Sequence, residues 1–130
     1  MKITTVIGSP RPKGNSATIA RTLIDTLSKG GAKNKTFELN SLSYRGCQGC
    51  MACKTTSEKC VVKDDLEAVL EDIRTSDVTI LASPVYVGDV TAQTKGLIDR
   101  FYSFYKNDFR TNPKPSRLPE GRKLVLMPSP

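Results

Sequence analysis

The residues of this chain best suited to chemistry are its four cysteines, which lie in one short segment at Cys47, Cys50, Cys53 and Cys60. Thiols at three-residue steps, followed by a fourth after six intervening residues, allow one loop to surround a compact metal centre. Structural zinc sites usually bring two C-x2-C pairs from separate places, whereas C-x2-C-x2-C is closer to the run that binds an iron-sulfur cluster. The spacing therefore favours an iron-sulfur centre in the segment 47–60.

Two other uses of the cysteines stay open on the residues alone, namely a zinc site and free redox-active thiols. Structural disulfides fit poorly, because cysteines so close in sequence would close only small loops. The start of the chain runs into Gly8 and Pro10 too early to hold the apolar core of a secretory leader. We therefore expect a cytoplasmic, reducing location, where thiols stay free or bind metal.

Composition narrows the chemistry further. The sequence contains no histidine, which excludes Ser-His-Asp and Cys-His nucleophiles, histidine general bases and histidine-ligated metals. With 130 residues, of which 38% are hydrophobic, the chain is expected to form a single domain over residues 1–130. No apolar run approaches the length of a membrane span, so no membrane association is expected.

The formal net charge of +7 has two interpretations. Six of the basic residues lie in or beside a proline-rich connection, residues 106–122, rather than on one helix face, which is typical of a solvated surface. The alternative is attraction of a phosphorylated cofactor or of an acidic redox partner protein. Because the chain lacks an aromatic or glycine-rich RNA signature, nucleic-acid binding is not expected.

A second candidate site precedes the first expected helix. Residues 2–7 are β-branched and apolar enough for a buried strand, and a turn rich in glycine, serine and proline follows from Gly8. A helical pattern then continues to about Lys29, with Asn15 or Ser16 as the capping residue. Such a helix start is suited to phosphate, because free amides and the positive end of the helix dipole converge there.

This turn differs from the best-known phosphate-binding motifs. A P-loop needs four residues between its glycines and a lysine after the second, whereas five residues separate Gly8 from Gly14 and an asparagine follows. The dinucleotide fingerprint G-x-G-x-x-G is also absent. Candidate donors to one terminal phosphate are Ser9, Arg11, Asn15, Ser16 and Thr18. An ordinary capped turn between a strand and a helix has the same pattern, so this alternative stays open.

The rest of the chain alternates further strands and helices. Strands are expected at residues 35–39, 77–83 and 123–127, and helices at 65–76 and from Thr91 onward. The 3.6-residue period predicts the buried positions of the three helices: Ile19, Leu23 and Leu27 in the first, Leu66, Val69, Leu70 and Ile73 in the second, and Leu97, Ile98, Phe101 and Tyr105 in the third. This alternation predicts an α/β fold with a parallel, doubly wound sheet.

The loops that follow three of these strands should share one edge of that sheet. Ligands of doubly wound sheets bind beyond the carboxyl ends of the strands. The segments 8–16, 40–60 and 84–90 each follow an expected strand. We therefore expect the phosphate loop and the cysteine loop to be neighbours.

In combination, these motifs resemble the NAD(P)H-dependent FMN reductase family, and within it the iron-sulfur flavoproteins. The resemblance rests on Gly-Ser-Pro-Arg followed by Gly-Asn-Ser, on the cysteine spacing before an Asp-Asp helix start, on Ser-Pro-Val-Tyr-Val-Gly and on Thr-Ala-Gln-x-Lys-x-x-Ile-Asp-Arg. It covers nearly all of residues 1–127. The family continues past its fourth strand, whereas this chain stops at Pro130, so a C-terminally short flavodoxin-like sheet of four strands instead of five is expected.

The resemblance also implies cofactors and their ligands. It assigns the FMN phosphate to Ser9, Arg11, Asn15, Ser16 and Thr18. It places along the isoalloxazine ring the loop residues Pro84, Val85, Tyr86, Val87 and Gly88. It assigns a 4Fe-4S cluster to Cys47, Cys50, Cys53 and Cys60, although relatives exist that keep some of these cysteines without a cluster. NAD(P)H or a redox protein would be the partner, and family members assemble as dimers or tetramers.

The resulting hypothesis is a cytoplasmic redox flavoprotein in which FMN and a 4Fe-4S cluster exchange electrons. Because the cofactors carry the chemistry, no catalytic acid or base is expected among the side chains. Two alternatives stay open. One is an FMN or quinone reductase without a cluster, and the other is a non-catalytic zinc- or flavin-binding regulatory module. The edge of the fourth strand is expected to be covered by another chain.

Overall fold

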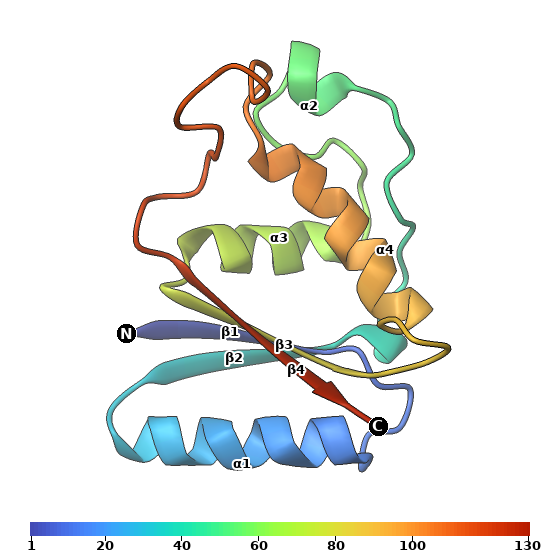
Figure 1. Ribbon diagram of the computed structural model, residues 1–130, viewed down its shortest axis with the longest axis vertical. Helices are drawn as coiled ribbons and strands as arrows, with labels where there is room; N and C mark the ends of the chain where they lie inside the picture. Colours follow the sequence, from blue (N-terminus) through green and yellow to red (C-terminus); the bar gives the residue numbers. More distant parts are fainter.

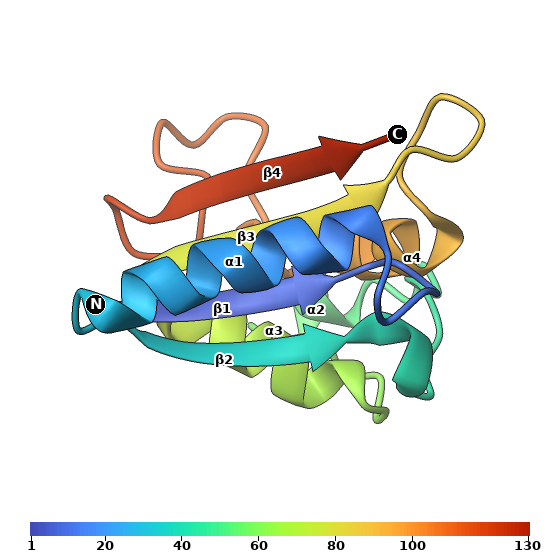
Figure 2. The same cartoon turned by 90° about the horizontal axis from the view of Figure 1, so that it is seen from below.

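A parallel sheet forms the centre of the structure, a computed structural model that describes residues 1–130. Its four strands have the order β2-β1-β3-β4 (Figures 1 and 2). The strands are β1 (Lys2–Ile7), β2 (Lys33–Glu38), β3 (Val78–Pro84) and β4 (Lys123–Ser129). The predicted α/β fold with a four-stranded parallel sheet is confirmed.

The inner strands β1 and β3 are buried over almost their whole length, as their apolar and β-branched residues require. The edge strand β2 begins two residues before the predicted start, because Lys33 and Asn34 pair with Lys2 and Ile3. Lys33 and Asn34 are polar and carry no strand signal of their own. Their pairing with β1 therefore decides where β2 begins.

Helix α1 (Asn15–Lys29) covers one face of the sheet, and α3 (Leu66–Thr75) and α4 (Ala92–Arg100) cover the other (Figures 1 and 2). The predicted buried side of α1 is wrong, since Ile19 is 50% exposed. The helix instead buries Ser16, Ala17 and Ala20. These small side chains let the helix approach the sheet closely, and the larger apolar residues lie at its flanks.

The predictions for the other face hold in part. Helix α3 buries the four predicted apolar residues, which belong to the main hydrophobic core together with Leu97 of α4. Helix α4 ends at Arg100 and continues as a short 3-10 helix, η2 (Phe101–Phe104). Tyr105 follows η2 and is 45% exposed. The prediction that it is buried is wrong because the 3.6-residue period ends with α4.

The remaining elements are two short helices and the exposed edge strand β4. A 3-10 turn, η1 (Leu39–Ser41), precedes the cysteines. A one-turn helix, α2 (Ala52–Thr55), lies among them. Strand β4 forms an edge of the sheet and exposes Leu124 and Leu126 by more than half of their surface. None of the helices combines the length and the hydropathy that a membrane span requires.

Candidate functional site

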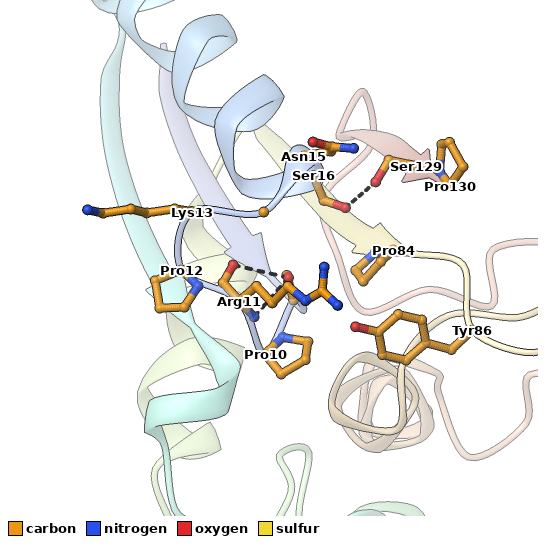
Figure 3. A pocket seen from close by; sticks show the side chains of 12 residues that line it. Pro10, Arg11, Pro12, Lys13, Asn15, Ser16, Pro84, Tyr86, Ser129 and Pro130 are labelled. Carbon is orange, nitrogen blue, oxygen red and sulfur yellow. Dashed lines mark hydrogen bonds between the residues drawn. The ribbon is translucent and has the colours of Figure 1, made fainter.

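A cleft of about 880 Å³ opens at the carboxyl edge of the sheet (Figure 3). Its walls come from the turn between β1 and α1, from the residues that end and follow β3, and from the end of β4. The lining residues are Ser9, Pro10, Arg11, Pro12, Lys13, Gly14, Asn15, Ser16, Pro84, Tyr86, Ser129 and Pro130. The topology explains this gathering, because parallel strands end at the same edge.

The start of α1 has no side-chain cap. Gly14 occupies the cap position, so the prediction of Asn15 or Ser16 as the cap is wrong. The first turn also contains no acidic residue. The amide of Thr18 donates to the carbonyl of Gly14 over 2.9 Å, and the amides before it have no acceptor within the helix. These free amides and the helix dipole make the cleft attractive to an anion.

The turn before α1 is held by hydrogen bonds of Ser9. Its hydroxyl accepts from the Arg11 amide and donates to the Arg11 carbonyl, each over 3.1 Å. A Cβ at Gly14 would lie 3.2 Å from Ser9 Oγ and 3.2 Å from Arg11 Cβ, so the turn closes tightly around a glycine. The Arg11 guanidinium extends toward Pro84 and Tyr86, whereas Lys13 extends the opposite way (Figure 3).

Sequence reasoning missed Ser129 as a residue of this cleft. The hydroxyls of Ser16 and Ser129 lie 2.5 Å apart, and both residues are buried (Figure 3). Ser129 could have been predicted only from the order of the strands in the sheet, because no motif in the sequence around it indicates a binding residue. A fourth parallel strand beside β3 must also end at the carboxyl edge, so its last residue belongs to the same site.

The structure brings together six of the ten residues that the resemblance assigns to FMN, namely Ser9, Arg11, Asn15, Ser16, Pro84 and Tyr86. Thr18 lies further along α1, outside the lining of the cleft. Val85, Val87 and Gly88 belong to a loop that projects past the cleft. Reciprocal hydrogen bonds between the backbones of Tyr86 and Asp89, 2.8 and 3.1 Å long, close that loop.

The four cysteines line a separate hollow of about 30 Å³. All four are free thiols, and Val61, Val62, Tyr102 and Arg100 contribute to the same walls. No three His, Cys, Asp or Glu side chains are close enough together to hold one metal ion. The loop therefore gathers the thiols around one hollow without forming the tight cage that a single ion requires.

Two cations attach this loop to the segment after α4. The Lys54 ammonium donates to the carbonyls of Tyr102 and Tyr105 over 2.6 and 2.9 Å, and it lies 4.0 Å above the Tyr102 ring. Arg117 donates to the carbonyls of Cys53 and Ser103 over 2.8 and 3.0 Å. At least one basic residue of the proline-rich connection therefore has a structural role, which the surface interpretation of the net charge did not foresee.

A buried ion pair lies at the base of the loop. Arg100 Nη1 is 2.7 and 2.6 Å from the two carboxylate oxygens of Asp64. Burial raises the pKa of Asp64, but hydrogen bonds from Arg100 and from the amides of Arg45 and Leu66 outweigh it and hold the pKa below its usual value. Burial likewise lowers the pKa of Arg100, but Asp64 and Cys60 reverse the effect and raise it. Both groups are therefore charged at neutral pH.

The expectation that the phosphate loop and the cysteine loop are neighbours is wrong within one chain. The cysteine loop runs beside α4, with Tyr44 bonded to the Gln93 carbonyl over 2.8 Å and Gly46 packed on Gly96. It reaches its hollow only at Arg100, the last residue of α4. Nine helical residues span about 13 Å. The backbone around α2, within the cysteine loop, also lies on the α3 and α4 side of the sheet, opposite α1 (Figures 1 and 2).

The strand order and a cleft at the start of α1 define a flavodoxin-like α/β protein. The sequence pattern of the NADPH-dependent FMN reductases matches residues 1–116, and the chain belongs to this family. An iron-sulfur flavoprotein of Methanocaldococcus jannaschii is 37% identical over 77% of this chain and 51% of its own length. One of Methanosarcina thermophila is 33% identical over 84% of this chain and 56% of its own. The chain thus spans about half the length of these relatives.

Solved structures confirm the fold. The NAD(P)H:quinone oxidoreductase from Methanothermobacter marburgensis superimposes with a TM-score of 0.73 at 18% identity, over 98% of this chain and 66% of that one. An FMN-dependent NADH-azoreductase of Bacillus anthracis, in complex with FMN, gives a TM-score of 0.65 at 9% identity, over 98% and 68% of the two chains. At these identities the similarity concerns the arrangement of the strands and helices.

Proposed function

We propose that this chain is the FMN-binding part of an NAD(P)H-dependent flavin oxidoreductase of the iron-sulfur flavoprotein type. The observation that carries the proposal is the uncapped start of α1, which opens into a cleft lined by Ser9, Arg11 and Ser16. A phosphate monoester fits this arrangement, because free amides, hydroxyls and a guanidinium are its usual donors. The family to which the chain belongs supports FMN as the molecule that carries this phosphate.

The residues of the cleft divide the work of holding FMN. Ser9, Arg11, Asn15 and Ser16 would hold the phosphate, and Ser129 would orient the Ser16 hydroxyl. Pro84 and Tyr86 would lie beside the ring system, with Val85, Val87 and Gly88 in the loop that continues past them. Thr18 would contribute through its place in the first turns of α1 rather than by contact. No acid or base is needed, since FMN when bound supplies the two-electron redox chemistry.

For the second site we propose a 4Fe-4S cluster bound by Cys47, Cys50, Cys53 and Cys60. The chemistry of the donors supports it, because four thiolates around one hollow are the usual ligands of such a cluster. The names of the relatives, iron-sulfur flavoproteins, also support it. A cluster would give the protein one-electron chemistry beside that of FMN, with a redox protein as partner.

A reductase without a cluster is the second candidate. The hollow between the thiols is only about 30 Å³, and no ligand group for one ion is formed. The structural similarity to a quinone oxidoreductase is compatible with this candidate. Iron and acid-labile sulfide in the purified protein would support the cluster, and flavin bands without iron would support the simple reductase.

The two sites are tested by a matched pair of substitutions. Ser16→Ala removes a hydroxyl at the phosphate and adds no bulk at this buried position, and Cys50→Ala removes one thiol. A hydrogen bond to a charged group contributes about 1.5–3 kcal/mol, so Ser16→Ala should weaken FMN binding about 10- to 100-fold. Cys50→Ala should remove iron and leave the FMN affinity unchanged. Loss of both cofactors in both variants would contradict the assignment of two separate sites.

A further inference from the structure

Arg100 occupies an unusual position for a charged side chain. It is the last residue of α4, is 1% exposed and has no contact with bulk water. Beyond its ion pair with Asp64, Nη1 donates to the Arg45 carbonyl and Nη2 to the Val62 carbonyl, each over 3.2 Å. Arg45 precedes the cysteines and Val62 follows them. One guanidinium therefore joins the two ends of the loop that carries all four thiols.

One nitrogen of this guanidinium has no hydrogen-bond partner. Arg100 Nε is buried and makes no hydrogen bond within the chain. Arg100 also lines the hollow between the cysteines, and the Cys60 thiol lies beside the guanidinium. A buried donor without an acceptor is costly, and nearly all such groups in folded proteins are paired. The free donor therefore indicates that the filled site supplies the missing acceptor.

We propose that Arg100 is a positioning residue of the cysteine site, which ties the ends of the loop together and donates its Nε–H to the Cys60 thiolate when the loop holds its cluster. This inference rests on the proposed cluster. Asp64 explains the fixed orientation of the guanidinium, because its two oxygens occupy Nη1. The Nε–H is left without an acceptor, and Cys60 is the thiol of the hollow that acts on this guanidinium, so its thiolate is the acceptor that we assign.

Such a contact has a consequence that a purely structural ion pair would not have. A bound cluster would supply one-electron chemistry, and its reduced form would carry one more negative charge without a proton. A donor and a positive charge beside one thiolate favour this reduced state, because hydrogen bonds to the sulfurs tune the potential. Arg100 therefore keeps the midpoint potential of the cluster high, while FMN beyond the other end of α4 is unaffected.

The experiment is an anaerobic potentiometric titration of the cofactor-loaded protein, followed by the cluster and flavin absorption bands. The variant is Arg100→Lys, which keeps the charge but lacks the Nε–H, and the matched control is Lys29→Met, which removes a cation at the end of α1. In Arg100→Lys we expect the one-electron equilibrium of the cluster to shift about tenfold toward the oxidised form, about 59 mV. The FMN potential, and both potentials of the control, should stay unchanged.

Two outcomes would overturn the proposal. A folded, iron-loaded Arg100→Lys variant with an unchanged cluster potential would show that the Nε–H does not act on the thiolate. If that variant does not fold, Asp64→Asn provides the second test. It removes the negative charge that offsets Arg100, so the cluster potential should rise, and an unchanged or lower value would contradict the proposal. A wild-type protein without iron and sulfide would instead refute the proposed cluster itself.

Discussion

Substitution of Gly8 by alanine tests how closely the phosphate loop is fitted to α4. Gly8 follows the last residue of β1 and begins the turn that lines the cleft. A Cβ at this position would lie 1.7 Å from Thr94 Oγ1, far inside van der Waals contact. The Thr94 hydroxyl has little freedom to move away. It is buried and donates to Thr91 Oγ1, which in turn donates to the Gly8 carbonyl over 2.7 Å.

The magnitude follows from these contacts. Overpacking of a buried site costs about 1–3 kcal/mol, and displacement of the Thr94 hydroxyl would sacrifice a hydrogen bond of about 1 kcal/mol. Alanine restricts the unfolded chain more than glycine does, which returns about 0.4–1 kcal/mol. We therefore expect Gly8→Ala to lower the free energy of unfolding by about 3 kcal/mol. For a chain of this length the melting temperature should fall by about 10 °C.

A double-mutant cycle with Thr94→Ala gives the decisive measurement, with urea unfolding as the assay. Thr94→Ala removes the clashing oxygen, and the nearest remaining atom, Thr94 Cβ, lies 3.1 Å from the new methyl group. The double variant should therefore lose only about 1–2 kcal/mol, less than Gly8→Ala alone, with a coupling of about 2 kcal/mol. If the two losses simply add, or if Gly8→Ala unfolds like the wild type, the steric argument is refuted.

Three further predictions concern other parts of the fold. Burial raises the pKa of Asp72, but hydrogen bonds from Thr4 and Lys2 outweigh this effect and lower the pKa. The ionised Asp72 carboxylate therefore stabilises the fold above about pH 4, and this stabilisation disappears as the pH falls through the pKa of Asp72 in the folded protein. The free energy of unfolding of Asp72→Asn, measured in urea, should depend less on pH in that range. Val87 is fully exposed with φ 49°, a conformation that asparagine tolerates, so Val87→Asn should raise the free energy of unfolding by about 1 kcal/mol, and a loss of stability would contradict this. The exposed apolar edge strand β4 should make the protein associate, so solution scattering should show an oligomer and Leu126→Lys should reduce its mass, whereas a monomeric wild type would refute the idea.

Much of the fold could be predicted because the strongest sequence signals are local. The apolar runs of β1 and β3 and the period of α3 identify buried elements without knowledge of their neighbours. The predictions fail where packing or pairing with a neighbouring element determines the structure. Lys33 is in a strand only because β1 offers a partner, and α1 buries Ala17 and Ala20 rather than Ile19 because the sheet accepts a close helix.

The candidate site shows the same division. Ser9 and Ser16 could be found from the turn in which they lie, whereas Ser129 reaches the cleft through the pairing of β4 with β3. The cysteines could be grouped from their spacing, but the place of their hollow could not. It depends on how the loop packs along α4, through contacts such as the close approach of Gly46 to Gly96, and neither residue carries a signal for it.

Helix α4 reaches both places at which we propose chemistry. Thr91, its N-cap, donates a hydrogen bond to the Gly8 carbonyl beside the cleft. Arg100, its last residue, donates to the Arg45 carbonyl at the start of the cysteine loop. Contacts at both ends thus fix the position of α4. A substitution that displaces the whole of α4 would therefore disturb both sites, whereas a change confined to the Arg100 side chain would leave the FMN cleft intact.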